Sequence, residues 1–211
     1  MKLVLAIILI SIFLYFFKGS KTGYVKTNGD WSWVTIDENN GKRIHLIEGI
    51  DQNSFTLLKN KCFALDQNQV YFNGKKIQHA SPNGFVLLSD DEYGYSKDKQ
   101  FVFFNNEVII NADPATFEVI QFPYSKDKND VYCGTVPMKL SSEEVLTYKV
   151  TNEDKLMAGM ISTTKLSHFL ELYPEYQWIA HQGIEIQNVI TGDWGTGTTF
   201  NKNFKGCKEV K

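Results

Sequence analysis

Two stretches of the chain contain residue types that catalytic and phosphate-binding sites use. Ser162-Thr-Thr-Lys165 matches Ser-x-x-Lys, in which a lysine activates a serine nucleophile. No partner motif of the penicillin-binding type follows, so we interpret Ser162 as the N-cap of a helix. Gly192-Asp-Trp-Gly-Thr-Gly197 resembles a glycine loop, but a phosphate loop also needs a buried strand before it and Lys-Ser/Thr after it. We interpret it as a turn-rich loop.

The remaining polar residues do not single out a reaction. His45, His79, His168 and His181 are scattered, and none has a second His or Cys at ligand spacing, so we expect no metal site. The acidic residues form many carboxylate pairs, none of them distinguished. We therefore expect a protein that is not an enzyme and uses no cofactor. An envelope hydrolase is an alternative, because the residues of a catalytic triad can be far apart in sequence and come together only in the folded protein.

Two aromatic groups are candidates for partner binding. Trp31 and Trp33 alternate with Ser32, which puts both rings on one face of a strand. That face either belongs to the core or forms a stacking platform for a sugar ring or a partner side chain. Trp194 lies in a Gly-Asp-Trp-Gly loop with few apolar neighbours, and an exposed tryptophan is a natural anchor for a partner.

Composition limits the classes of partner. The net charge of −2 predicts no broad attraction to nucleic acid or to anionic lipid. Cys62, Cys133 and Cys207 are an odd number of cysteines, so one disulfide could form in an oxidising compartment, and sequence cannot choose the pair. Cys133 is at a strand position, where we expect a buried free thiol.

An apolar run, Leu3–Phe17, interrupted only by Ser11, opens the chain, with Lys2 before it and Lys18 and Lys21 after it. It is short for a bilayer span of about 20 residues and typical of a signal peptide. No small-x-small cleavage site and no lipoprotein cysteine follow it. We expect an uncleaved membrane anchor, with a cleaved signal peptide and a buried core helix as the alternatives.

A unit recurs between Phe63 and Gly134. Phe63-Ala-Leu-Asp66 aligns with Tyr95-Ser-Lys-Asp98 at an offset of 32 residues, and a third copy starts at Tyr124, 29 residues after Tyr95. A degenerate copy upstream is suggested by Asn40-Gly-Lys-Arg-Ile44 and Asp51-Gln-Asn-Ser-Phe55. A period near 30 residues indicates one supersecondary unit that is repeated and stacked.

The residues of the unit predict a β-meander. Val70-Tyr-Phe72 and its copies suit a buried strand, and Asn73-Gly74 supplies the positive φ angles of a type I′ hairpin turn. Asp98 and Asp127 lie between the Tyr-led strand and the Val-led strand of their units, where each can fix a turn by accepting backbone N–H groups. In Asp113-Pro-Ala-Thr-Phe117, the aspartate can cap a single helical turn, after which Phe117 packs back onto the sheet.

These residues resemble the bacterial DKNYY family, and the best match is Tyr124-Ser-Lys-Asp-Lys-Asn-Asp-Val-Tyr132 with Ala112-Asp-Pro-Ala-Thr-Phe117. The resemblance covers residues 60–135, and would begin at residue 24 if the degenerate copy is counted. Leu65 and Gln67 replace the lysines of the first copy, and Cys133 replaces an aromatic residue in the last. The resemblance implies a structural repeat and brings no catalytic residues. Some members are similar to envelope or immunity-type proteins.

We expect the chain from Met138 onward not to repeat. Leu166, Phe169, Leu170 and Tyr173 have the spacing of an apolar helix face, which predicts a helix over 163–173 that Pro174 closes. A shorter helix can open at residues 152–154. Residues 178–180 and 184–186 read as two strands, and the polar chain after Gly192 reads as loosely ordered.

The predicted fold is mainly β, with repeated antiparallel β-meander units, a C-terminal α+β segment and one N-terminal hydrophobic helix. We expect an anchor or signal at 1–20, a repeat domain at 22–137 and the α+β segment at 138–211. The expected function is a non-catalytic binding protein, anchored in the cytoplasmic membrane through residues 3–17, with its folded part facing the periplasm or the cell exterior. Its partner would be a protein, such as a toxin that it neutralises, and a cell-wall glycan is the alternative.

Overall fold

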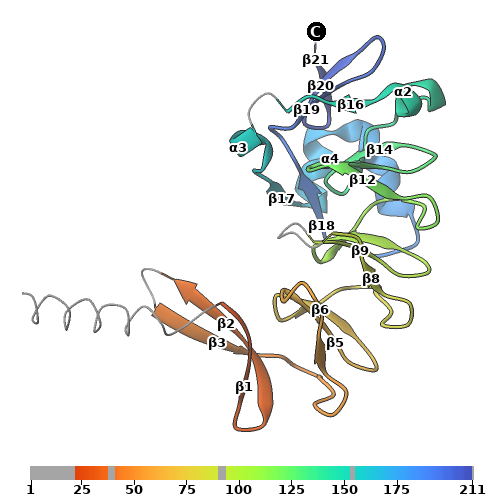
Figure 1. Ribbon diagram of the computed structural model, residues 1–211. Helices are drawn as coiled ribbons and strands as arrows, with labels where there is room; N and C mark the ends of the chain where they lie inside the picture. The colour runs from red at the N-terminus through yellow and green to blue at the C-terminus, as the bar shows by residue number, and fades with distance from the viewer. Residues whose placement is uncertain (1–21, 38–40, 90–93, 153–154, 211) are drawn as a thin grey trace, which may run out of the picture.

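The computed structural model describes residues 22–37, 41–89, 94–152 and 155–210, and in them the protein is mainly β. Small antiparallel sheets follow one another from the N-terminal sheet, in orange at the bottom of Figure 1, to the C-terminal strands at the top. The predicted N-terminal hydrophobic helix falls outside the described residues. Within them, no helix has the length and apolar character needed to cross a bilayer.

The first sheet has three strands in the order β1 (Gly23–Thr27), β2 (Asp30–Asp37), β3 (Gly41–Leu46). Tyr24 pairs with Trp33 across β1 and β2, so both rings lie on one face of the sheet. That face packs against the next sheet, where Phe55 lies 5.6 Å from Tyr24 and 5.0 Å from Trp31 between ring centroids.

Three four-stranded meanders follow, and they confirm the sequence repeat. Each has a short first strand, a second and a third strand of three residues, and a short last strand. The first contains β4 (Thr56–Leu57), β5 (Phe63–Leu65), β6 (Val70–Phe72) and β7 (Lys75–Lys76); the second β8 (Val86–Leu87), β9 (Tyr95–Lys97), β10 (Val102–Phe104) and β11 (Glu107–Val108); the third β12 (Glu118–Gln121), β13 (Tyr124–Lys126), β14 (Val131–Cys133) and β15 (Val136–Pro137).

The last sheet is a fourth copy of the same meander. It contains β16 (Lys149–Val150), β19 (Thr196–Thr198), β20 (Asn203–Lys205) and β21 (Lys208–Val210) in that order. The registers agree: Thr196 pairs with Lys205 as Tyr95 pairs with Phe104. The sequence similarity therefore ends near Gly134, but the structural repeat continues to the end of the described chain.

Turn hydrogen bonds identify the fourth copy independently. The N–H of Gly206 donates to the carbonyl of Gly195 at 2.8 Å, as that of Asn105 donates to Gly94 at 2.9 Å. Gly206 has φ +57°, which matches φ +57° at Asn105. The N–H of Thr199 also donates to the carbonyl of Lys202, and the first three meanders each make the equivalent bond from their turn aspartate.

We name these meanders unit 1 (residues 51–80), unit 2 (81–112), unit 3 (113–140) and unit 4 (141–151 and 195–210). Residues 152–194, which interrupt unit 4 between its first and second strands, are the insertion. It contains α3 (Lys155–Ala158), β17 (Ser162–Lys165), α4 (Leu166–Leu172), the 3₁₀ helix η1 (Pro174–His181) and β18 (Asn188–Thr191).

Successive units are joined by one aromatic residue each. The middle residue of the third strand packs into the core of the preceding unit, or into the N-terminal sheet for unit 1. These residues are Tyr71, Phe103, Tyr132 and Phe204, all buried. The stack is therefore held by apolar burial between neighbours, as in other repeat proteins.

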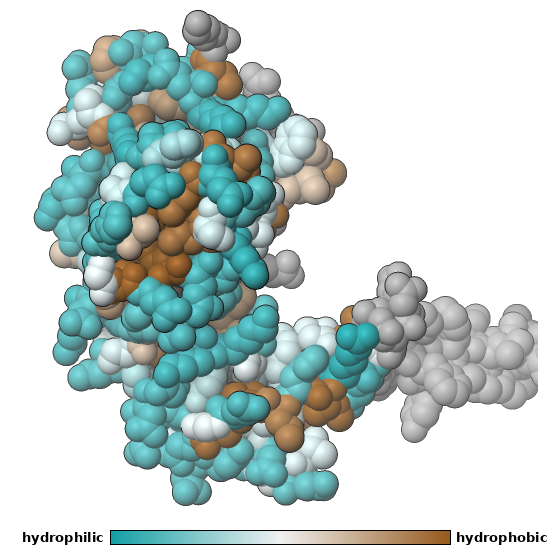
Figure 2. All heavy atoms as spheres, turned by 180° about the vertical axis from the view of Figure 1, so that it is seen from behind, coloured by the Kyte–Doolittle hydropathy of each residue, from teal (hydrophilic) through white to brown (hydrophobic). Residues whose placement is uncertain are grey.

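The insertion packs on the side of units 2 and 3. Phe169 and Ile179 of α4 and η1 form one core with Ile110 and Val136 of those units. Leu166 lines a hollow beside that core. Seen from behind, apolar side chains gather on this half of the molecule inside a hydrophilic rim (Figure 2).

Several sequence predictions for this region are wrong in detail. The helix predicted over 163–173 begins only at Leu166, because Ser162 to Lys165 pair with β18 as a strand. Residues 178–180 belong to η1, residues 184–186 form no strand, and residues 196–210 form three paired strands instead of a loose tail. The one-turn helix predicted at Asp113–Phe117 is a hydrogen-bonded turn, and a helix, α2 (Ser142–Thr147), occupies that place only in unit 4.

Candidate functional site

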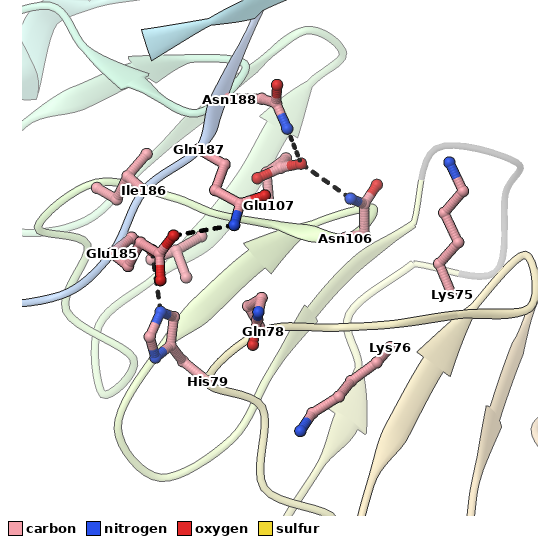
Figure 3. Close-up of a pocket in the computed structure, with 11 residues that line it drawn as sticks. Lys75, Lys76, Gln78, His79, Asn106, Glu107, Glu185, Ile186, Gln187 and Asn188 are labelled. Carbon is pink, nitrogen blue, oxygen red and sulfur yellow. Dashed lines mark hydrogen bonds between the residues drawn. The ribbon is translucent and has the colours of Figure 1, made fainter. Parts of the chain in front are cut away.

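A polar cavity of about 280 Å³ lies where the insertion returns beside units 1 and 2 (Figure 3). Unit 1 contributes its last strand and the turn after it, unit 2 contributes its hairpin turn and β11, and the insertion contributes residues 185–188. The side chains that matter most for its chemistry are Lys75, His79, Asn106, Glu107, Glu185 and Asn188. Three segments far apart in sequence thus form one site.

Glu107 is the half-buried acid of this cavity. Its Oε1 accepts hydrogen bonds from the side-chain amides of Asn106 at 2.8 Å and Asn188 at 3.0 Å. Burial raises the pKa of the Glu107 carboxyl, while the two amides and the Lys75 ammonium oppose the rise. The Asn105 turn, with φ +57°, places Glu107 at the start of β11.

The other side of the cavity is a hydrogen-bonded edge. His79 Nε2 lies 3.0 Å from the backbone carbonyl of Glu185, so this nitrogen carries the proton and donates it. The Gln187 amide donates to Glu185 Oε1 at 2.9 Å. The described lining includes no Ser, Thr or Cys, so it offers hydrogen bonds and charge but no acyl-transfer nucleophile.

A second surface, which we name the aromatic groove, lies between α4, the start of η1 and strands β20 and β21. Two adjoining hollows of about 250 and 500 Å³ share Phe169, Tyr173 and Lys208. The rings of Phe169 and Tyr173 stack at 4.7 Å, and Lys208 Nζ lies 4.7 Å from the centre of the Tyr173 ring. Stacked rings under a cation suit a partner with both apolar and anionic groups.

Trp194 lies at the edge of the aromatic groove. Its side chain is 45% exposed, and the ammonium of Lys205, which lines the groove, lies 4.5 Å from the ring centre. The residue before it, Asp193, also lines the groove. The structure therefore places Trp194 in an exposed loop, where the sequence predicted it.

Trp31 and Trp33 are placed differently from Trp194. Trp33 is buried and lies against Tyr24, with ring centroids 4.8 Å apart, and Trp31 is half-buried against Phe55. Both rings face unit 1, so the pair belongs to the contact between the N-terminal sheet and the repeats. The three tryptophans do not form one site.

The Ser-x-x-Lys pattern does not form a nucleophile. Ser162 and Lys165 lie three residues apart in strand β17, so their side chains point to opposite faces. Ser162 Oγ donates to Asp193 Oδ2 at 2.6 Å, and the predicted helix cap is wrong. Across the described ranges, no three His, Cys, Asp or Glu side chains come together as a metal site would require.

The three cysteines are free thiols, and Cys133 is buried as predicted. Cys207 Sγ lies 3.7 Å from the backbone carbonyl oxygen of Cys133, in the core that joins units 3 and 4. The hydrogen bond with Cys133 and burial raise the pKa of the Cys207 thiol. Both effects keep Cys207 in its neutral form.

Comparison with known proteins returns one family. A model of the DKNYY family matches residues 37–94 and 83–136, which span the second half of the N-terminal sheet, units 1 and 2, and most of unit 3. No curated protein and no solved structure matches the chain significantly. The matched segments carry the turn aspartates and the strand aromatics on which the resemblance rested. The repeat region of this chain, residues 37–136, matches the DKNYY family.

Proposed function

We propose that this chain is a membrane-anchored, non-catalytic binding protein. Units 1 to 4 act as a scaffold, and the insertion with unit 4 supplies the surface that contacts another protein. In the sharper form of this proposal, the chain is an immunity protein of the bacterial envelope and the partner is a toxin delivered by a competitor. The apolar run Leu3–Phe17 would hold it in the cytoplasmic membrane, with units 1 to 4 outside the cytoplasm.

The observation that carries the proposal is the exposed Trp194 beside the aromatic groove. Tryptophan is among the residues that contribute most to protein interfaces, because its large ring is buried completely when a partner docks. Here the ring lies next to Lys205, and the groove adds Phe169, Tyr173 and Lys208. Since all these residues belong to the insertion or to unit 4, the surface is specific to this part of the chain.

Site-specific crosslinking in living cells tests the proposed surface. A photoreactive amino acid replaces Trp194 in the full chain, and Phe200, also exposed at 57% in unit 4, is replaced in the matched control. We expect one discrete crosslinked protein from position 194 and none from position 200. An equal pattern from both positions would contradict the surface, and so would failure of position 194 to crosslink any protein.

The immunity form has its own test. Trp194→Ala and deletion of residues 3–17 should each abolish protection against a co-cultured competitor, whereas Phe200→Ala should leave it intact. Unchanged protection in the first two variants would refute both the site and the tether. Detection of the Trp194→Ala chain at wild-type level separates lost binding from lost folding.

Binding of cell-wall glycan is the second candidate, and the polar cavity is the observation that favours it. Asn106, Glu107 and Asn188 offer the carboxylate and amide groups that hydrogen-bond sugar hydroxyls. The chain would then sediment with purified peptidoglycan, and Asn188→Ala would reduce the sedimented fraction. Absence of the wild-type chain from the pellet would eliminate this candidate.

A further inference from the structure

We propose that Cys133 and Cys207 form a disulfide that ties unit 4 to unit 3 when the chain folds in an oxidising compartment. The sequence offers three cysteines and leaves the pair open. The fold brings two of them together, because Cys207 Sγ lies 3.7 Å from the backbone carbonyl oxygen of Cys133 and both side chains belong to one core. Cys62 packs in a different core, which joins units 1 and 2.

The two sulfur atoms are neighbours in this core. The hydrogen bond with the Cys133 side chain is the main cause that raises the pKa of the Cys207 thiol. Cys133 Sγ in turn lies 3.7 Å from the backbone carbonyl oxygen of Gly192. Thiols are weak donors, so oxidation removes little hydrogen bonding from the core. A disulfide needs the sulfur atoms at about 2 Å, and rotation about the Cα–Cβ bonds of two adjacent side chains supplies that movement.

The aromatic groove gives an oxidant access to one of the two sulfur atoms. Cys207 lines both hollows of the groove, whereas Cys133 is 0% exposed and lines neither. An oxidising disulfide, either a small molecule or the disulfide of an oxidoreductase, therefore reacts first at Cys207. Cys133 then attacks the Cys207 sulfur from the side of the core.

The reaction consists of two thiol–disulfide exchanges. The Cys207 thiolate attacks one sulfur of the oxidant, forms a mixed disulfide and expels the other sulfur as a thiolate. The Cys133 thiolate attacks Cys207 Sγ, forms the bond between the two cysteines and expels the remaining sulfur of the oxidant. In total the two protein thiols lose two electrons and two protons, and the oxidant becomes two thiols. Because Cys207 is held in its neutral form, the exchange is slow until unit 4 opens.

The bond would close a loop that contains the whole insertion. Residues 134–206 lie between the two cysteines, and a disulfide across a long loop stabilises the fold by restricting the unfolded chain. The hairpin of β20 and β21, whose Lys205 and Lys208 line the aromatic groove, would be held against unit 3. The supply of oxidant in cells rests on the proposed location outside the cytoplasm, whereas the choice of pair does not.

Thiol trapping on the full chain in detergent tests the pairing. The chain is incubated with equal amounts of reduced and oxidised glutathione in urea below its unfolding midpoint, where local opening exposes buried thiols. It is then alkylated with N-ethylmaleimide in saturating urea, digested without reduction and analysed by mass spectrometry. We expect a linked peptide pair that contains Cys133 and Cys207, and maleimide or glutathione on Cys62 alone. Cys62→Ser is the matched control, which should form the same linkage and carry neither label.

The same mixture in saturating urea measures pairing without the fold. The linkage of Cys133 to Cys207 should be about tenfold rarer there, because the fold gives the two sulfur atoms a high effective concentration. Maleimide or glutathione on all three cysteines below the midpoint would overturn the inference. A linkage that involves Cys62, or one that is equally frequent in saturating urea, would overturn it as well.

Discussion

One aspartate in each of units 1 to 3 closes the unit through hydrogen bonds. Asp127 Oδ1 accepts the N–H groups of Asn129 and Asp130, and its Oδ2 accepts the N–H of Asp113 and the hydroxyl of Tyr132. Asp66 makes the same four bonds in unit 1, to Asn68, Gln69, Asp51 and Tyr71. A carboxylate is needed because only its two oxygens can accept bonds from both sides of the turn.

Unit 2 provides a natural comparison, because Phe103 stands where units 1 and 3 have a tyrosine, and Asp98 has no hydroxyl partner there. We predict that Tyr132→Phe, which gives unit 3 the same arrangement, lowers the free energy of unfolding by about 1 kcal/mol. Asp127→Ala removes all four bonds and should cost about 3 kcal/mol or more. Urea titration followed by tryptophan fluorescence measures both, and equal losses from the two variants would contradict the central role of the carboxylate.

At the scale of elements, the hairpin turns of the units are docking points for the segments at either end of the chain. Asn73 and Gly74 have φ of +50° and +75°, and the Tyr24 hydroxyl accepts the N–H of Gly74 at 3.0 Å. In unit 3, Gly134 lies so close to the carbonyl of Ile190 that a Cβ would be only 2.2 Å from that oxygen. The same turn that reverses the strand therefore also leaves room for a neighbouring backbone or ring.

Two glycines with nearly equal φ allow the cost of a left-handed backbone to be separated from the cost of close packing against a neighbour. A Cβ on Gly74 (φ +75°) would lie 2.3 Å from Trp33 Cβ, whereas one on Gly183 (φ +76°) would contact nothing within 4 Å. Gly183→Ala should cost about 1 kcal/mol for the left-handed backbone alone. Gly74→Ala should cost about 3 kcal/mol, since overpacking adds to the same strain. Denaturant midpoints of the two variants measure the difference, and similar midpoints would mean that Trp33 does not rest on this turn.

The Glu144 carboxyl in helix α2 of unit 4 should make the stability of the protein depend on pH. The Lys202 ammonium, 2.6 Å from Glu144 Oε1, and the N–H of Ser141 lower the pKa of the Glu144 carboxyl from 4.5 to about 2. Because the folded-state pKa is below that of the unfolded chain, this stabilisation is complete above about pH 4.5 and is lost as pH falls towards 2.

We therefore expect Glu144→Gln to lower the melting temperature at pH 7 and to flatten its fall between pH 5 and pH 2. Lys128 similarly lowers the pKa of the Asp113 carboxyl to about 2, so Asp113→Asn should flatten the same range in unit 3. Thermal melts at several pH values check this. A Glu144→Gln chain that keeps the wild-type slope would show that its ion pair with Lys202 has no net effect.

At the scale of the whole molecule, unit 4 ends the stack by being polar on its outer side. The residues that pack against the following unit in unit 2 are Tyr95, Val102 and Phe104, and the register of unit 4 puts Thr196, Asn203 and Lys205 at those positions. A terminal repeat needs a polar outer face, because an apolar one would attract another chain. We expect these polar residues to prevent end-to-end association through unit 4.

The prediction is that restoring the apolar residues makes the chain associate through this end. A variant with Thr196→Tyr, Asn203→Val and Lys205→Phe should form dimers or larger species in size-exclusion chromatography in detergent. Lys61→Phe with Gln67→Val, at exposed positions in unit 1, is the control and should stay at the wild-type elution volume. A triple variant that elutes as wild type would contradict the capping role of unit 4.

The sequence by itself determined the parts of the structure that depend on local chemistry. β-Branched and aromatic residues identified the strands around Val70 and Val102, and Asn73-Gly74 identified a hairpin turn. Asp98 and Asp127 were correctly expected to fix turns. The exposure of Trp194 was also predicted, because its neighbours in sequence are small and polar. These features need only a few adjacent residues, and the repeat presents them several times.

Only the tertiary structure decided the rest, because it depends on pairing between distant residues. Unit 4 is recognisable from its backbone hydrogen bonds and not from its sequence. Polar residues stand where the other units have outer aromatic residues, and the insertion separates Thr151 from its hydrogen-bond partner Thr196. Ser162 became part of a strand because Thr191 pairs with it, although its local sequence favours a helix cap. The polar cavity joins Glu107 to Asn188 across 81 positions, and no local pattern could bring those two side chains together.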